Sequence, residues 1–128
     1  MRYNKLEGVL LDYAVGRTLG EDVYLIKNGR THVGVRRTLK EPKVVEGIKI
    51  TTEEYAPHAK GDQLTEIVEQ FKVALFPPPS AKSNKWTARV CDDNECIFTE
   101  GEGVGTAACR AVLAALNGTR KEYSYNKV

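Results

Sequence analysis

Residues 100–118 read EGEGVGTAACRAVLAALNG, and this stretch decides the fold because it predicts a glycine-rich turn that runs directly into an amphipathic helix. Glycine adopts backbone conformations that other residues avoid, so the turn can be tight. Thr106 is the expected N-cap of the helix. One sector of about 100° on the helix holds the side chains that we expect to face the core: Cys109, Val112, Leu113 and Leu116. The rest of the chain is therefore expected to pack around this helix.

The start of the predicted helix has the features of an anion-binding corner. The first N–H groups of a helix have no intrahelical partner and attract anions, and an arginine one turn along would add a charged donor. The candidate ligand contacts are therefore Gly103, Gly105, Thr106 and Arg110. The glycine spacing matches neither the dinucleotide fingerprint nor the phosphate loop of nucleoside triphosphatases. From the residues alone, a tight structural turn with a surface arginine is the alternative interpretation.

Before this stretch, apolar residues alternate with a period of two and predict three short strands. The strands cover residues 73–76, 86–91 and 95–99 and form an antiparallel meander, with a polar turn at 92–95 between the last two. A short helix over residues 63–70 precedes the meander. Its expected buried face consists of Leu64, Ile67, Val68 and Phe71.

The N-terminal half begins with a predicted helix over residues 5–19. Asn4 is the expected N-cap of this helix, and Gly20 is expected to end it. Apolar residues recur at helical spacing, which defines the face that we expect to be buried. This face consists of Leu6, Val9, Leu10, Tyr13 and Ala14.

Asn28-Gly29 predicts the turn of a β-hairpin, because this dipeptide between two extended runs is the strongest short-range hairpin signal. The two strands cover residues 23–27 and 31–37, and the second strand alternates Val33 and Val35 with Gly34 and Arg36. Residues 41–60 contain several proline and glycine breaks and predict a loop-rich segment. An additional strand in this segment would contain Val44, Val45, Ile48 and Ile50.

These elements indicate an α+β fold. Strands that occur in hairpins, rather than singly between helices, favour a small and mainly antiparallel sheet with about three helices packed on it. The 128 residues are expected to form a single domain, 1–128. Residues 120–128 are polar and rich in tyrosine, and we expect either a short strand or a flexible tail there.

The charge of the chain argues against a nucleic-acid-binding protein, because 19 Lys and Arg residues face 17 Asp and Glu residues, for a net charge of +2. No run approaches the roughly 20 apolar residues of a membrane span. No apolar signal segment precedes the first predicted helix. We therefore expect a cytoplasmic protein that makes no membrane contact.

The hairpin region concentrates positive charge. Arg30, Arg36, Arg37 and Lys40 are candidate phosphate contacts, since a guanidinium can pair with a phosphate through two hydrogen bonds. A solvated hairpin face is the alternative interpretation. Trp86 and Phe76 are the candidates for stacking on a flat base. For these two aromatic residues, the alternative is packing in the core.

The sequence predicts a binding protein rather than an enzyme, with no catalytic residue, no cofactor and no metal ion. No Ser-His-Asp or Cys-His grouping occurs at a known spacing. Cys91 and Cys96 are expected to face each other across a turn, and in a reducing cytosol we expect two thiols rather than a disulfide. They lack the second pair of ligands that a structural zinc site needs, since His32 and His58 are too scattered.

Four short pieces of the sequence occur in an order known from a phage family. They are LDYAV at 11–15 with LG at 19–20, IVE at 67–69 followed by KVAL at 72–75, WTA at 86–88, and TAACRA at 106–111. On these pieces the chain resembles the small phage-encoded ABA-sandwich proteins. That family usually has a proline where this chain has Val104 or Gly105. Its central part is also shorter and less basic, so residues 20–60 are covered poorly.

The resemblance implies a function. Proteins that share this general sequence pattern include the phage proteins that counter the Thoeris system. Those proteins bind cyclic ADP-ribose isomers and hold them without cleavage. By this likeness the chain is expected to be a phage or prophage anti-defence protein in the bacterial host cytoplasm. It would sequester a cyclic nucleotide second messenger, and cyclic oligonucleotides at a second site. The likeness also implies a homo-oligomer, either a dimer or a hexamer built from dimers. The alternative is a phage accessory protein-interaction module with no small-molecule ligand.

Overall fold

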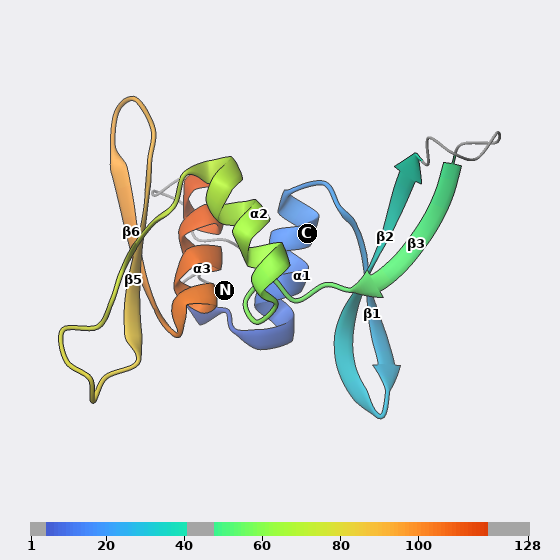
Figure 1. Cartoon of the computed structure of the whole chain (residues 1–128), viewed down its shortest axis with the longest axis horizontal. Coiled ribbons are helices and arrows are strands. Elements are labelled where there is room, and N and C mark those ends of the chain that lie inside the picture. Colours follow the sequence, from blue (N-terminus) through green and yellow to red (C-terminus); the bar gives the residue numbers. More distant parts are fainter. Residues whose placement is uncertain (1–4, 41–47, 118–128) are drawn as a thin grey trace.

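Three helices lie between two small antiparallel sheets in the computed structural model, which describes residues 5–40 and 48–117 (Figure 1). The elements follow in the order α1 (Gly8–Thr18), β1 (Asp22–Asn28), β2 (Arg30–Lys40), β3 (Ile48–Glu54), α2 (Gly61–Phe71), β4 (Ala74–Phe76), β5 (Lys85–Cys91), β6 (Cys96–Glu102) and α3 (Val104–Asn117). One sheet has the order β1-β2-β3 and the other β4-β5-β6. The α+β class, the antiparallel pairing and the three helices are confirmed.

The strands form two sheets where one was expected, because the segment predicted as loop-rich contains a strand. This strand, β3, pairs with β2 from Gly34↔Glu54 to Lys40↔Ile48, so the N-terminal hairpin gains its third strand locally. Ile48 and Ile50 lie in β3, as predicted for the additional strand. Val44, Val45 and the expected tail at 120–128 lie outside the described residues.

Helix α3 is the centre of the core. It packs against β5 and β6 on one side and against α1 and α2 on the other. A run of its residues has no exposed surface, and most of them are alanines: Ala107, Ala108, Cys109, Ala111, Val112, Leu113 and Ala114. Small side chains let neighbouring elements approach a helix that is buried almost all round. The predicted core position Leu116 is wrong, because this residue is exposed in the last turn of α3.

Helix α1 begins at Gly8 and not at residue 5, with Glu7 as its N-cap. The predicted N-cap, Asn4, lies outside the described residues. The predicted end is confirmed, since Gly20 has a φ of +79°. The backbone N–H groups of Gly20 and of the next residue donate to carbonyls in the last turn of α1, which forms a Schellman motif.

The buried face of α1 differs in part from the predicted one. Leu6, just before the helix, is buried as expected, whereas Leu10 is exposed. The buried stripe runs instead through Leu11 and Val15, because α1 lies between α3 and the strands β1 and β2. Asp12 belongs to this same buried stripe.

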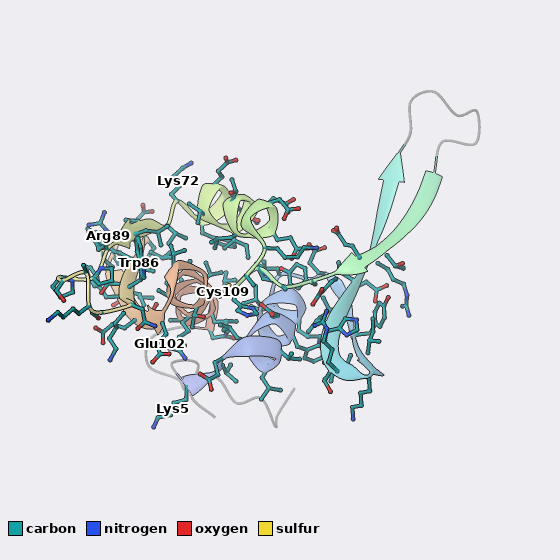
Figure 2. The ribbon with its side chains drawn as sticks, turned by 60° about the horizontal axis from the view of Figure 1, so that its bottom comes forward. Lys5, Lys72, Trp86, Arg89, Glu102 and Cys109 are labelled. Atoms are coloured by element: carbon teal, nitrogen blue, oxygen red, sulfur yellow. A yellow bond between two sulfur atoms is a disulfide. The ribbon has the colours of Figure 1, made fainter. Side chains whose placement is uncertain are left out.

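The predicted hairpin is confirmed, with its turn centred on Gly29. Asn28 pairs with Arg30 across the turn, and Gly29 has a φ of +79°, which favours glycine. Val33 and Val35 are buried, as the alternation predicts. Beyond the segment in which β1 pairs with β2, the strands β2 and β3 remain paired with each other and extend away from the helices (Figure 2).

The predicted meander is confirmed with shifted ends. Strand β6 runs from Cys96 to Glu102, so Gly101 belongs to a strand and not to a loop. Cys91 and Cys96 are register partners, as expected. A disulfide joins them, which corrects the expectation of two thiols. The pairing follows from their position directly across the hairpin, where their Cα atoms are 4.0 Å apart.

Helix α2 buries Ile67 as predicted, and it also buries a glutamine outside the predicted face. Gln63 is 2% exposed. Its side-chain oxygen accepts a hydrogen bond from the Ala56 N–H at 2.7 Å, and its side-chain nitrogen donates to the Glu54 carbonyl at 2.8 Å. These two bonds fasten the segment between β3 and α2. The other residues of the predicted face are half-buried: Leu64, Val68 and Phe71.

Gln63→Leu is expected to lower the free energy of unfolding by about 2–4 kcal/mol, because leucine leaves a buried N–H and a part-buried carbonyl of the backbone without these partners. Urea unfolding followed by circular dichroism measures this loss. Gln70→Leu is the matched control, since Gln70 is exposed on the same helix. The control should change the free energy by less than about 0.5 kcal/mol. Equal losses in the two variants would contradict the structural role of Gln63.

Candidate functional site

The expected anion corner lies where β6 passes into α3. The strand ends at Glu102, Gly103 makes the turn with a φ of +93°, and the helix begins at Val104. Thr106 is therefore not the N-cap, because the helix starts two residues earlier. The Gly103 N–H donates to the carbonyl of Asn84 at 2.9 Å, so this N–H is already used within the fold.

The glycines of the corner are explained by close packing. A Cβ at Gly101 would lie 2.6 Å from the backbone nitrogen of Ala107, because α3 folds directly back on β6. A Cβ at Gly105 would overlap the backbone carbonyl of His58. Both glycines are buried. Gly103 alone of the three has the positive φ that favours glycine. The glycines that suggested an anion cradle thus serve the contacts between β6, α3 and the segment that contains His58.

Arg110 is the basic residue in the first part of α3, and the fold itself uses two of its five N–H donors. Its Nε donates to the carbonyl of Leu6, and one terminal nitrogen donates to the carbonyl of Glu100, both at 2.9 Å. Burial lowers the pKa of Arg110, while the carboxylates of Glu7 and Glu102 raise it. Through these contacts Arg110 ties the segment before α1 to strand β6.

A hollow of about 730 Å³ opens beside Arg110, between β6, the first turn of α3 and the start of α1. Thr106 and Phe98 line it. Its charged residues are three acids and two bases: Glu7, Glu100, Glu102, Lys85 and Arg110. Because the negative charges are in excess and Arg110 is bonded to carbonyls, the hollow does not favour a phosphate. Two of the predicted contacts, Thr106 and Arg110, therefore lie together on an acidic surface.

The basic residues of the hairpin lie in the other sheet, across the helices from this corner (Figure 1). Arg30 forms two hydrogen bonds of 3.1 Å with the carboxylate of Glu54 and thereby lowers the pKa of that carboxyl. Arg36 lies 3.4 Å from the carboxylate of Asp22. Arg37 follows on β2. The structure thus does not bring these arginines to the corner within one chain.

The two predicted stacking residues lie on opposite faces of the β4-β5-β6 sheet. Trp86 is half-buried and packs on the core, which agrees with the alternative to base stacking that the sequence left open. Phe76 is 40% exposed on the outer face, where the guanidinium of Arg89 lies 5.4 Å from the centre of its ring. Trp86 and Arg89 come from the same strand, β5 (Figure 2). Phe98, which is 59% exposed, is the register partner of Arg89 on β6. We call Phe76, Arg89 and Phe98 the outer patch.

A buried aspartate paired with a histidine was not expected from the sequence. Asp12 is 2% exposed, and Nδ1 of His58 donates to its carboxylate, with the two oxygens at 2.7 and 2.8 Å. The hydrogen bond to Asp12 raises the pKa of His58. Burial raises the pKa of Asp12, and the contacts with His58 oppose this shift. The sequence signal that could have revealed this pair is an aspartate between apolar residues on the first helix.

The remaining chemistry of the described residues is limited. Cys109 is fully buried, and burial raises the pKa of its thiol, so this cysteine lacks the thiolate that a nucleophile needs. Within residues 5–40 and 48–117, no group of three or more His, Cys, Asp or Glu side chains is arranged to hold a metal ion. No helix in these ranges has the length and apolar character to cross a membrane.

Comparison with known proteins gives one family match over nearly the whole chain. The family model described as Bacteriophage P22, NinX matches residues 2–115. The matched region includes both sheets, the Asp12–His58 pair and the corner at Arg110. No curated protein matches the chain.

Proposed function

The chain belongs to the bacteriophage P22 NinX family, and on this premise we propose that it is a phage accessory protein that binds another protein through the outer patch. The family makes it a phage protein. The proposed activity is binding without a small-molecule ligand, and it rests on the surface of the β4-β5-β6 sheet. One face of this sheet packs on α3, and the other carries the outer patch.

The observation that carries the proposal is the exposure of Phe98 beside Arg89. Phe98 is the most exposed large apolar residue among those described, at 59%. Arg89 forms no salt bridge with the described residues, and it lies between Phe98 and Phe76 on the sheet. Aromatic residues and arginine are enriched at the centres of protein interfaces, where they supply much of the binding energy. The outer patch therefore has the composition of an interface core.

The charges around the patch favour a protein partner over a nucleic acid. Lys85, Glu100 and Glu102 lie on the same face of the sheet as Arg89, since they alternate with the residues that face α3. The face thus has two basic and two acidic residues. Nucleic-acid binding requires an excess of positive charge to replace counterions along the phosphates. A protein surface with an apolar area and a carboxylate opposite Arg89 would complement the patch.

The cyclic nucleotide sponge stays a prediction, and the contacts of the corner do not support it. A bound pyrophosphate would lie among three carboxylates, and two of the five N–H donors of Arg110 are already bonded to carbonyls. Calorimetry against cyclic ADP-ribose isomers and cyclic di- and trinucleotides tests this alternative. Micromolar binding of any of them, with the ligand recovered intact, would overturn our proposal in favour of the sponge.

A photoreactive amino acid in place of Phe76 tests the proposal directly in phage-infected cells. We expect irradiation to join the chain to one protein of defined mass. We also expect Phe98→Ser to weaken binding of that purified protein by about tenfold or more. Leu25 is the matched control, because it is 41% exposed on the other sheet. A photoreactive residue at Leu25 should not give the same adduct, and Leu25→Ser should leave the affinity unchanged. An adduct with nucleic acid, no adduct, or equal effects at the two positions would overturn the proposal.

A further inference from the structure

Strand β6 forms an edge of the β4-β5-β6 sheet, because it pairs with β5 alone. In an antiparallel pair, residues that exchange hydrogen bonds alternate with residues whose N–H and C=O groups point away from the other strand. At one end of the β5–β6 pair, the Asp92 N–H donates to the Glu95 carbonyl at 2.9 Å. At the other end, the Gly103 N–H donates to the Asn84 carbonyl at 2.9 Å. These two bonds fix the alternation, so the residues of β6 that bond to β5 are Ile97, Thr99 and Gly101.

Three residues between these turn their backbone N–H and C=O groups away from β5: Cys96, Phe98 and Glu100. The carbonyl of Glu100 agrees with this direction, because it accepts the hydrogen bond from Arg110. Within residues 5–40 and 48–117, no hydrogen bond joins another group to the outward groups of Cys96 and Phe98, or to the N–H of Glu100. Such unpaired groups can bond to an added strand. We call this part of β6, from Cys96 to Glu100, the open edge.

The hollow of about 730 Å³ wraps around the open edge. Phe98 and Glu100 line it from the outer face of the sheet, and Thr99 lines it from the face that packs on α3. Residues from both faces can line one hollow only where it passes around the edge of the strand. Because neighbouring strands lie about 4.8 Å apart, an added strand would occupy this space. The open edge is thus accessible as well as unpaired.

The open edge carries an acidic side chain that no basic residue faces across the sheet. The register partner of Glu100 on β5 is Thr87. The two bases of the hollow are placed differently, since Lys85 is the register partner of Glu102. Arg110 donates to two carbonyls. A basic residue of an added strand, placed beside Glu100, would therefore complete a pair of opposite charges across the two strands.

We propose that the protein partner adds an extended segment to the open edge, with an apolar residue beside Phe98 and a basic residue beside Glu100. This inference rests on the proposed function, because it names the kind of segment that the partner supplies. Main-chain hydrogen bonds to the open edge supply affinity, and the alternating side chains supply specificity. The ring of Phe98 is 59% exposed, so it can contact the added strand and still belong to the outer patch. Strand β6 separates the added strand from Arg89, so the carboxylate opposite Arg89 comes from another part of the partner.

Peptides that the purified chain selects from a random display library are the probe for this proposal. We expect the selected peptides to carry a basic residue two positions from an apolar one. A bound peptide should slow hydrogen exchange at the backbone amides of Phe98 and Glu100 by about tenfold or more, measured by nuclear magnetic resonance. Thr99 is the internal control, because its N–H already bonds to β5. Its amide should exchange slowly with and without the peptide.

Glu100→Pro tests the main-chain bond separately from the side chain. Proline removes the outward N–H, and an edge strand tolerates it where the N–H does not bond to the neighbouring strand. Glu100→Ala is the matched control, since it removes the same carboxylate and keeps the N–H. Calorimetry should show that Glu100→Pro binds the selected peptide about tenfold more weakly than Glu100→Ala does. Equal affinities of the two folded variants would contradict the proposed bond. If circular dichroism shows that Glu100→Pro is unfolded, the exchange rates of the unaltered chain decide.

The free chain can also contradict the proposal. Slow exchange at Phe98 and Glu100 without peptide would show that the edge is already covered, by the same chain in a monomer or by a second copy in a dimer. A library that yields no binding peptide, or only peptides that protect neither amide, would likewise overturn it. The adduct at Phe76 tests the proposed function separately. If the protein in that adduct binds without slowing either amide, this inference alone fails. If no adduct forms but selected peptides protect both amides, the proposed function fails and the open edge remains a strand-binding site.

Discussion

Gly105→Ala is expected to lower the free energy of unfolding by at least about 3 kcal/mol. The added Cβ would overlap the carbonyl oxygen of His58 and lie 2.8 Å from its Cα. The atoms that this Cβ would meet belong to the backbone of His58, so no change of side-chain rotamer relieves the clash. Helix α3 would have to move away from the segment that contains His58, which would also disturb the contact with Asp12. Urea unfolding, with circular dichroism as the signal, measures the loss.

Gly61→Ala is the matched control for this substitution. Gly61 is the first residue of α2, as Gly105 is the second residue of α3, and a Cβ there would have no atom within 4 Å. Alanine at this position should leave stability unchanged or raise it by up to about 1 kcal/mol, because it restricts the unfolded chain. If Gly105→Ala were as stable as Gly61→Ala, the close packing of α3 on the His58 segment would be disproved.

His58→Ala is expected to lower the free energy of unfolding by about 2–3 kcal/mol at neutral pH, because it leaves the buried carboxylate of Asp12 without its hydrogen-bonding partner. Without His58, burial of Asp12 favours its neutral form more strongly. The deficit of the variant should grow as the pH falls towards 6.5, where His58 of the wild type becomes fully protonated, and should shrink in more acidic solution, where Asp12 becomes protonated. Urea unfolding at a series of pH values measures it. His32→Ala, on the exposed hairpin, is the control and should cost less than about 0.5 kcal/mol.

The wild-type chain should itself lose stability as the pH rises. The folded-state pKa of His58 is raised above its ordinary value of 6.5, so the folded chain holds this proton more tightly than the unfolded chain. The stabilisation is complete below that ordinary value and disappears as the pH rises through the raised one. The raised pKa of Asp12 acts in the same direction at lower pH. His58→Ala should remove the slope near neutral pH, and a slope that persists would show that other groups cause it.

The local elements could be predicted because neighbouring residues determine them. Asn28-Gly29 needs only its own strands to form a hairpin, and the period of two predicts β5 and β6 without reference to the rest of the chain. The bounds of strand β3 could not be predicted, because proline and glycine flank it and its pairing with β2 determines them. The stripe of α1 through Leu11 rather than Leu10 depends on two layers packed on either side of the helix.

The sequence singled out the corner at Thr106 and Arg110, but the chemistry of this corner could not be predicted, and neither could the outer patch. Thr106 and Arg110 do lie beside a hollow, as the pattern indicated. Arg110 bonds to the carbonyl of Leu6, a residue 104 positions away, and no local pattern reveals such a partner. The same holds for Asp12 and His58, which are 46 positions apart. The excess of acid in the hollow appears only when β6 and the start of α1 are brought together.

The central place of α3 has a consequence for the order of events during protein synthesis. The β1–β2 hairpin depends on contacts close in sequence, so it can form while the ribosome is still extending the chain. The faces of α1, β5 and β6 that pack on α3 have no covering layer until α3 is made, and α3 is the last of the described elements. Nascent chains that end before residue 104 would therefore expose apolar surface that chaperones recognise.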